Sequence, residues 1–171
     1  VYKGIKSGIE RWSKILMPVL LLIMLALIIR SLTLPGAMDG VRFYLTPDFS
    51  KINADSVLTA LGHAFFSLSL GMGAMITYGS YIDRQENLFT ATLSVVALDT
   101  LVALMAGLAI FPAVFAQGFG PDAGPGLVFQ VLPTVFHQIP LGAFWAFLFF
   151  VLLLIAALTS GISLLEVVTA Y

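Results

Sequence analysis

The stretch FFSLSLGMGAMITY, residues 65–78, lies within a long apolar segment but contains residues that weaken a helix. These residues are Ser67, Ser69, Gly71, Gly73 and Thr77. A glycine lowers helix propensity by roughly 1 kcal/mol in water, and a serine hydroxyl can bond local backbone in place of the helical ladder. The stretch therefore allows two interpretations: small residues at a close contact between membrane helices, or a helix that breaks at mid-membrane.

The composition places the chain among integral membrane proteins. Of its 171 residues, 60% are hydrophobic and 10% are charged, and the mean hydropathy is +1.03. A soluble domain could not keep so much apolar surface away from water. The apolar runs are too long and continuous for the alternating pattern of a barrel, so the predicted fold class is an all-α membrane protein. A net charge of −1 gives no nucleic-acid footprint, and the lack of cysteine excludes disulfides and thiol chemistry.

Four apolar spans are predicted, at about residues 15–32, 57–81, 88–116 and 141–171. Proline and glycine punctuate the two long loops between them, 33–56 and 117–140, whereas 82–87 is a short polar turn. Asp48 is a candidate cap for one short helix in the first loop, and residues 126–139 are amphipathic enough for short surface helices. We expect the chain to be one part of a larger transporter-sized protein.

The basic residues predict the orientation in the membrane. The amino-terminal flank and the 82–87 turn share one side, which holds Lys3, Lys6, Arg11, Lys14 and Arg84. The side of the long loops holds Arg42, Lys51 and Arg30, the last at a helix end from which it is expected to reach the outer interface. The positive-inside rule therefore places the short turn in the cytoplasm and the long loops outside.

Two further features could complement a broken helix, whose free carbonyl groups suit an alkali cation and whose free N–H groups suit a carboxylate. Asp99 lies about eleven residues into the third span, where a carboxylate is costly unless it is paired. A bound cation, protonation or a hydrogen bond to a neighbouring helix would satisfy it. In IAALTSGIS, residues 155–163, Thr159 and Ser160 follow Ala156 by about one turn. Their hydroxyls could share a cation with the Ala156 carbonyl, or could simply bond that carbonyl.

The segments FFSLSLGMGAMITYGSY, GLAIFPAVFA, FQVLPTVF and LTSGIS resemble the neurotransmitter:sodium symporter family over essentially the whole chain. The resemblance implies part of a LeuT-type inverted-repeat bundle, from the fifth to the eighth transmembrane helix. It also implies that the second span is a discontinuous helix, split near residues 68–72. The family's first broken helix, in the first half of the transporter, would lie before residue 1.

The resemblance also implies the roles of individual residues. Ser67 and Asp99 would bind a first sodium ion, and Ala156, Thr159 and Ser160 a second, with both sites partly formed by residues outside this chain. The substrate would lie against Phe66, Leu68, Ser69, Gly71, Met72, Ser160 and Leu164. Tyr81 resembles a residue of the cytoplasmic gate.

Two positions differ from those of other family members. Asp99 stands where LeuT-like proteins have an asparagine, and Ala103 stands where chloride-dependent relatives carry a serine. A fixed carboxylate beside sodium can replace the charge of the anion, which predicts chloride-independent transport. At Asp99 and at Met72, whose side chain is flexible and polarizable, the chain is more similar to a bacterial multi-hydrophobic amino-acid transporter of the family than to LeuT.

The function implied is sodium-coupled symport of hydrophobic or aromatic amino acids by alternating access. The protein would be multi-pass in the cell (plasma) inner membrane, with lipid, sodium and an amino acid as partners and no nucleic acid. A cation channel or a non-transporting amino-acid sensor of the same fold is the alternative. An enzyme is disfavoured, because His63 precedes Ser67 by one turn without an oxyanion-hole motif and a single aspartate cannot form a dyad. Neither His63 nor His137 has a second ligand at metal spacing, so structural roles are expected for both. Glu166 could line a cytoplasmic exit path, or it could have a packing or interfacial role.

Overall fold

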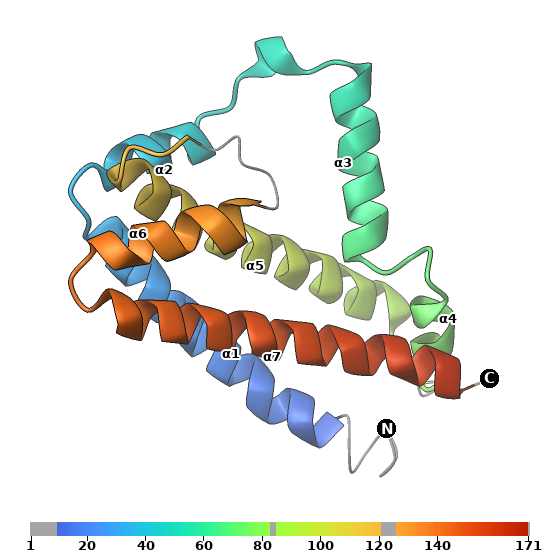
Figure 1. Cartoon of the computed structure of the whole chain (residues 1–171). Coiled ribbons are helices and arrows are strands. Elements are labelled where there is room, and N and C mark those ends of the chain that lie inside the picture. Colours follow the sequence, from blue (N-terminus) through green and yellow to red (C-terminus); the bar gives the residue numbers. More distant parts are fainter. Residues whose placement is uncertain (1–9, 83–84, 121–125, 171) are drawn as a thin grey trace. The chain divides into compact units, whose positions relative to one another are not determined.

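The computed structural model describes residues 10–82, 85–120 and 126–170, and these contain helices but no strand (Figure 1). Lys3, Lys6 and Arg84, which entered the charge argument, lie outside the described residues. The helical elements are α1 (Glu10–Leu32), α2 (Ala37–Leu45), η2 (Phe49–Lys51), α3 (Ala54–Ser67), α4 (Ala74–Gly79), α5 (Leu88–Ala116), η3 (Leu127–Val131), α6 (Leu132–Gln138) and α7 (Gly142–Thr169).

Three of these helices are long and apolar enough to cross a membrane. They cover Arg11–Leu32, Leu88–Ala116 and Gly142–Thr169. The predicted span at 57–81 is instead divided between α3 and α4, which have 14 and 6 residues. The chain is therefore an all-α membrane protein in which one apolar segment is a discontinuous helix.

The discontinuity lies where the serines and glycines of the 65–78 stretch predicted it. Helix α3 ends at Ser67 and α4 begins at Ala74, with a non-helical connection between them (Figure 1). Ser69 and Gly73 have φ angles of 55° and 74°, in the left-handed region that ends a right-handed helix. Among the described residues, a Cβ atom at Gly71 would meet nothing within 4 Å, so no close contact with this part of the chain explains that glycine. The break, not the close-packing interpretation, accounts for this stretch.

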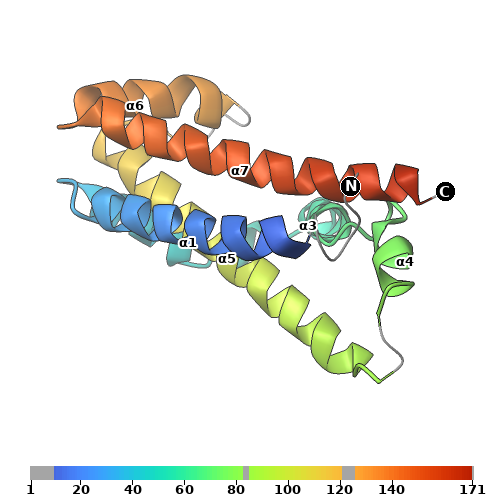
Figure 2. The same ribbon diagram turned by 90° about the horizontal axis from the view of Figure 1, so that it is seen from below.

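The chain forms two compact units. Of the described residues, the first contains 10–13, 48–82, 85–102 and 158–170, and the second contains 14–47, 103–120 and 126–157. In the second unit, α6 runs alongside the first half of α7 (Figure 2), and the Phe136 and Phe149 rings lie 5.5 Å apart. Ten buried apolar residues form its core, and Val114, Leu132 and Val135 are among those least exposed.

The loop predicted at 33–56 contains more helix than expected. Asp48 caps the three-residue helix η2, as predicted, because its carboxylate accepts a hydrogen bond from the Ser50 N–H at 3.1 Å. The Ser50 hydroxyl and N–H also lower the pKa of the Asp48 carboxyl. The nine-residue helix α2 was not predicted, because Gly40 is one of the glycines and prolines that punctuate this loop in the sequence. Gly40 instead allows α2 to approach α5, since a Cβ atom there would clash with the Phe111 backbone.

Candidate functional site

The first candidate site joins the end of α3 to the middle of α5. The Ser67 hydroxyl lies 2.9 and 2.7 Å from the two carboxylate oxygens of Asp99. Ser67 is the last residue of α3, so its carbonyl belongs to the last turn, in which helix carbonyls lack intrahelical partners. The site thus brings together hydroxyl and carboxylate oxygens beside a helix end. This hydrogen bond also agrees with the simpler interpretation of Asp99, in which the carboxylate is satisfied by a hydrogen bond from a neighbouring helix.

A cavity of about 360 Å³ lies beside the break, within the first unit. Phe66, Ser69, Met72, Ser160 and Leu164, all predicted substrate contacts, line it, and so does Ser67. The predicted contacts Leu68 and Gly71 are not among its walls. Its lining is mixed, because aromatic, thioether and aliphatic groups alternate with serine hydroxyls.

Sequence reasoning missed one polar residue of this cavity. Ser163 lines it from α7, and its hydroxyl donates to the Thr159 carbonyl at 3.1 Å. The available signal was helical spacing, because Ser163 follows Ser160 by three residues and so falls on a similar face. Ala74, the first residue of α4, also lines the cavity.

The second candidate cation site lies along one helix. Ala156, Thr159 and Ser160 belong to adjacent turns of α7, which is helical throughout Gly142–Thr169. Ser160 lines the 360 Å³ cavity. Across the described ranges, no group of three or more histidine, cysteine, aspartate or glutamate side chains could hold a metal. A cation bound here would therefore depend on hydroxyl and carbonyl oxygens, which suit hard cations better than transition metals.

Tyr81, the predicted gate residue, has a partner that the sequence did not specify. Its hydroxyl donates to the Glu166 carboxylate at 3.1 Å, and Glu166 is buried, with 7% of its surface exposed. The Tyr78 and Tyr81 rings meet edge to face at 6.3 Å, and the buried Tyr78 hydroxyl has no hydrogen-bond partner within the described part of the chain. Tyr81 also lines a cavity of about 210 Å³ with Thr77 and Ser80. Tyr81 thus forms one wall of a cavity with a mixed polar and apolar lining.

Comparison with known proteins decides the family. The model of the sodium:neurotransmitter symporter family matches residues 1–171. The chain belongs to this family. An uncharacterised sodium-dependent transporter of Bacillus subtilis (strain 168), YhdH, is 49% identical to this family member over 170 residues, covering 99% of the chain and 38% of YhdH. An uncharacterised sodium-dependent transporter of Haemophilus influenzae (strain ATCC 51907 / DSM 11121 / KW20 / Rd) is 50% identical over 166 residues, covering 97% of the chain and 36% of the relative.

A solved structure supports the same assignment for this symporter-family chain. The crystal structure of MhsT in complex with L-phenylalanine matches it with a TM-score of 0.84 and 55% sequence identity. The match covers 96% of this chain and 37% of MhsT. The LeuT-type fold and the similarity to MhsT predicted from Met72 and Asp99 are therefore confirmed. The chain spans little more than a third of the length of these relatives.

Proposed function

We propose that this chain forms part of a sodium-coupled symporter that carries hydrophobic or aromatic amino acids by alternating access through the cell (plasma) inner membrane. One observation carries the proposal: the helix break at residues 68–73 lies next to the bond between Ser67 and Asp99. A break in an apolar segment leaves main-chain groups without helical partners, and such groups suit an ion or a polar substrate in a protein-enclosed cavity. The family and its sodium-dependent relatives support coupling to sodium.

The first sodium ion would bind at Ser67 and Asp99. The Ser67 hydroxyl donates to the Asp99 carboxylate. Sodium could bind both groups, because the hydroxyl keeps its oxygen lone pairs when it donates and the carboxylate has further lone pairs. This shared coordination would link ion binding to the end of α3, and therefore to the break that follows it. Ala156, Thr159 and Ser160 would bind the second ion, and residues outside the chain would complete both shells.

The substrate would occupy the 360 Å³ cavity, whose volume falls within the range of small-molecule sites. Its carboxylate would be bound by the family's first broken helix, outside this chain, and its apolar side chain would lie against Phe66, Met72 and Leu164. Leu68 and Gly71 would contribute through the main chain of the break. Because Met72 is flexible and polarizable, we propose tolerance of several apolar side chains rather than one.

Transport would not require chloride, because Asp99 supplies a fixed negative charge beside the first sodium. Ala103, one turn later, offers no hydroxyl to an anion. Coupling would be reciprocal: sodium should raise substrate affinity, and substrate should raise sodium affinity by the same factor. Tyr81, hydrogen-bonded to Glu166, would serve as a cytoplasmic gate residue.

The test is uptake into proteoliposomes that contain the full-length protein. An inward sodium gradient should drive labelled leucine or phenylalanine above its equilibrium concentration, and potassium should not replace sodium. A channel of the same fold would equilibrate the solute without accumulating it, and a sensor would bind it without uptake. Equal substrate binding in sodium and in potassium would rule out the proposed coupling.

A further inference from the structure

We propose that the second unit contains a binding site for a short-chain monocarboxylate, with its carboxylate at Arg30 and Ser31 and its alkyl tail in an adjoining apolar cavity. The proposal concerns residues that the transport site does not use, and it does not depend on the proposed function. It rests on two neighbouring cavities, one with a polar corner and one without polar walls.

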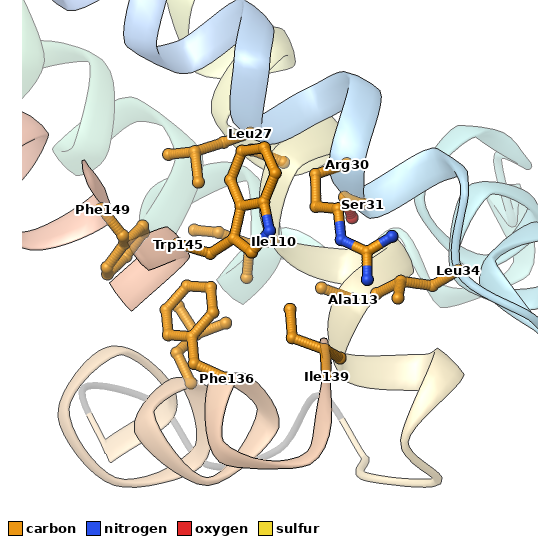
Figure 3. Close-up of a pocket in the computed structure, with 12 residues that line it drawn as sticks. Leu27, Arg30, Ser31, Leu34, Ile110, Ala113, Phe136, Ile139, Trp145 and Phe149 are labelled. Atoms are coloured by element: carbon orange, nitrogen blue, oxygen red, sulfur yellow. The ribbon is translucent and has the colours of Figure 1, made fainter. Parts of the chain in front are cut away.

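The polar corner contains two unsatisfied donors. Ser31 is 3% exposed and lines a cavity of about 20 Å³, as does Arg30 (Figure 3). The Ser31 hydroxyl and the Arg30 Nε are buried and have no hydrogen-bond partner among the residues that the structure describes. A buried donor without an acceptor costs about 1–3 kcal/mol, and more when it is charged. The corner therefore favours a ligand that accepts hydrogen bonds.

The positive charge of Arg30 indicates that the hydrogen-bond acceptor of the ligand is an anionic group. Its Nη1 reaches the Thr33 hydroxyl at 3.4 Å, but within the described ranges no carboxylate forms an ion pair with it. Arg30 as a whole is half-buried and its Nη1 contact is exposed, which agrees with a side chain that extends to the interface, whereas its Nε is buried. Figure 3 shows the guanidinium extending from α1 toward Ala113 and Ile139, with the Trp145 indole nitrogen on the side that faces Arg30. A carboxylate suits this corner, since charge-assisted hydrogen bonds are stronger than neutral ones.

The adjoining cavity indicates the size and the apolar character of the ligand's alkyl tail. It has a volume of about 90 Å³ and shares Leu27, Ala109, Ile110 and Phe149 with the polar cavity. Its remaining walls come from apolar side chains of α1, α5, η3 and α7. An apolar cavity of roughly 150 Å³ holds a benzene molecule, so this one suits an alkyl group of about three to four carbons.

The same walls exclude an amino acid as the preferred ligand. Among the residues that the structure describes, no aspartate or glutamate lines either cavity, so an α-ammonium group would lack a counter-charge from them. The ligand class is thus a branched or linear carboxylic acid without an amine. Because the ligand would contact α1, α5, α6 and α7 of the second unit, its binding should stabilise their packing.

The experiment measures binding of sodium 3-methylbutanoate to the full-length protein in detergent, at constant sodium, by calorimetry and by the shift in Tm. The comparison ligands are 3-methylbutanamide, which lacks the charge, acetate, which lacks the tail, and leucine, which adds the amine. We expect saturable binding of 3-methylbutanoate and at least about tenfold weaker binding of each comparison ligand at this site. Equal affinity for the amide or for acetate would overturn the proposal, and so would a site that prefers leucine.

Three variants locate the site. Arg30→Gln should weaken binding about tenfold or more, and Ser31→Ala about fivefold, through loss of one hydrogen bond each. Ala106→Phe, at a wall of the apolar cavity alone, should abolish binding of 3-methylbutanoate by filling the space of the tail. Arg42→Gln is the matched control, because it removes a cation from the same unit but not from either cavity, and it should leave the affinity unchanged. If Arg30→Gln fails to fold, unchanged affinity in both Ser31→Ala and Ala106→Phe would equally overturn the proposal.

Discussion

Ser67 and Asp99 are 32 residues apart in the sequence, yet the Ser67 hydroxyl contacts both carboxylate oxygens of Asp99, at 2.9 and 2.7 Å. This relationship ties the end of α3, where the helix breaks, to an acidic residue in the apolar helix α5. An intramembrane carboxylate is costly unless a partner or a proton satisfies it. A single hydroxyl is a small compensation for that cost, which leaves Asp99 suited to bind a cation.

Asp99→Asn should lower the apparent affinity for sodium about tenfold or more, because it removes the charge from the proposed first site. Uptake of labelled phenylalanine as a function of sodium concentration measures the effect. Thr100→Ala is the control, since the Thr100 hydroxyl donates to the Val96 carbonyl of its own helix. Equal sodium dependence in Asp99→Asn and the parent protein would remove Asp99 from the site.

Chloride should become stimulatory when Asp99→Asn is combined with Ala103→Ser. The double change removes the fixed negative charge and adds a hydroxyl one turn later, where a chloride ion could supply the charge. The measurement exchanges chloride for gluconate during uptake. The parent protein should be indifferent to this exchange, and a parent that needs chloride would contradict the proposed role of Asp99.

Gly73→Ala should destabilise the protein by roughly 1–2 kcal/mol, the cost of a left-handed conformation for a residue with a Cβ atom. Gly73 has a φ of 74°, and the nearest obstacle to a Cβ atom, Val167 Cγ1, is at an ordinary 3.6 Å. The cost would thus come from the backbone and not from a clash. Gly71→Ala is the matched control, because a Cβ atom there meets nothing within 4 Å. The Tm should fall for the first variant and stay nearly constant for the second.

Leu164→Phe should shift selectivity toward smaller substrates. Leu164 lines the 360 Å³ cavity, so a larger ring there reduces the space for the substrate side chain. In the parent protein we expect leucine and tryptophan to compete with labelled phenylalanine far better than glycine does. In the variant, tryptophan should lose more affinity than leucine, and a parallel loss for both would point to general damage. A parent protein that strongly prefers glycine would contradict the proposed substrate class.

Local patterns in the sequence predicted the break and the Asp48 cap. Ser67–Gly73 carries the break because glycine and serine act on their own stretch of backbone, and Asp48 caps η2 through a residue two positions away. The same logic failed for α2, because Gly40 weakens a helix locally but permits a close contact with Phe111 on α5. That contact joins residues about seventy positions apart, and no local pattern reports it.

The partners of the functional side chains were also beyond sequence reasoning. Asp99 was recognised as an intramembrane carboxylate, but its contact with Ser67 depends on how α3 meets α5. Likewise Glu166 could be assigned to either an exit path or packing, until the structure paired it with Tyr81, 85 residues away. Ser163 shows the opposite case, since its spacing from Ser160 would have sufficed to find it.

Tyr81→Phe should destabilise the protein by about 1–3 kcal/mol, because it removes the hydroxyl that donates to the buried carboxylate of Glu166. Tyr78→Phe is a matched control three residues earlier, in α4, since the buried Tyr78 hydroxyl has no partner among the described residues and its removal should be neutral or stabilising. If Tyr81 is a gate residue, its variant should also increase accessibility from the cytoplasmic side. Labelling of an introduced cysteine at Ser80, which lines the adjoining cavity, measures this accessibility, with Ser80→Cys alone as the reference. Equal Tm values for the two phenylalanine variants would show that the bond to Glu166 contributes nothing, and equal labelling rates would show that Tyr81 does not close the cytoplasmic path.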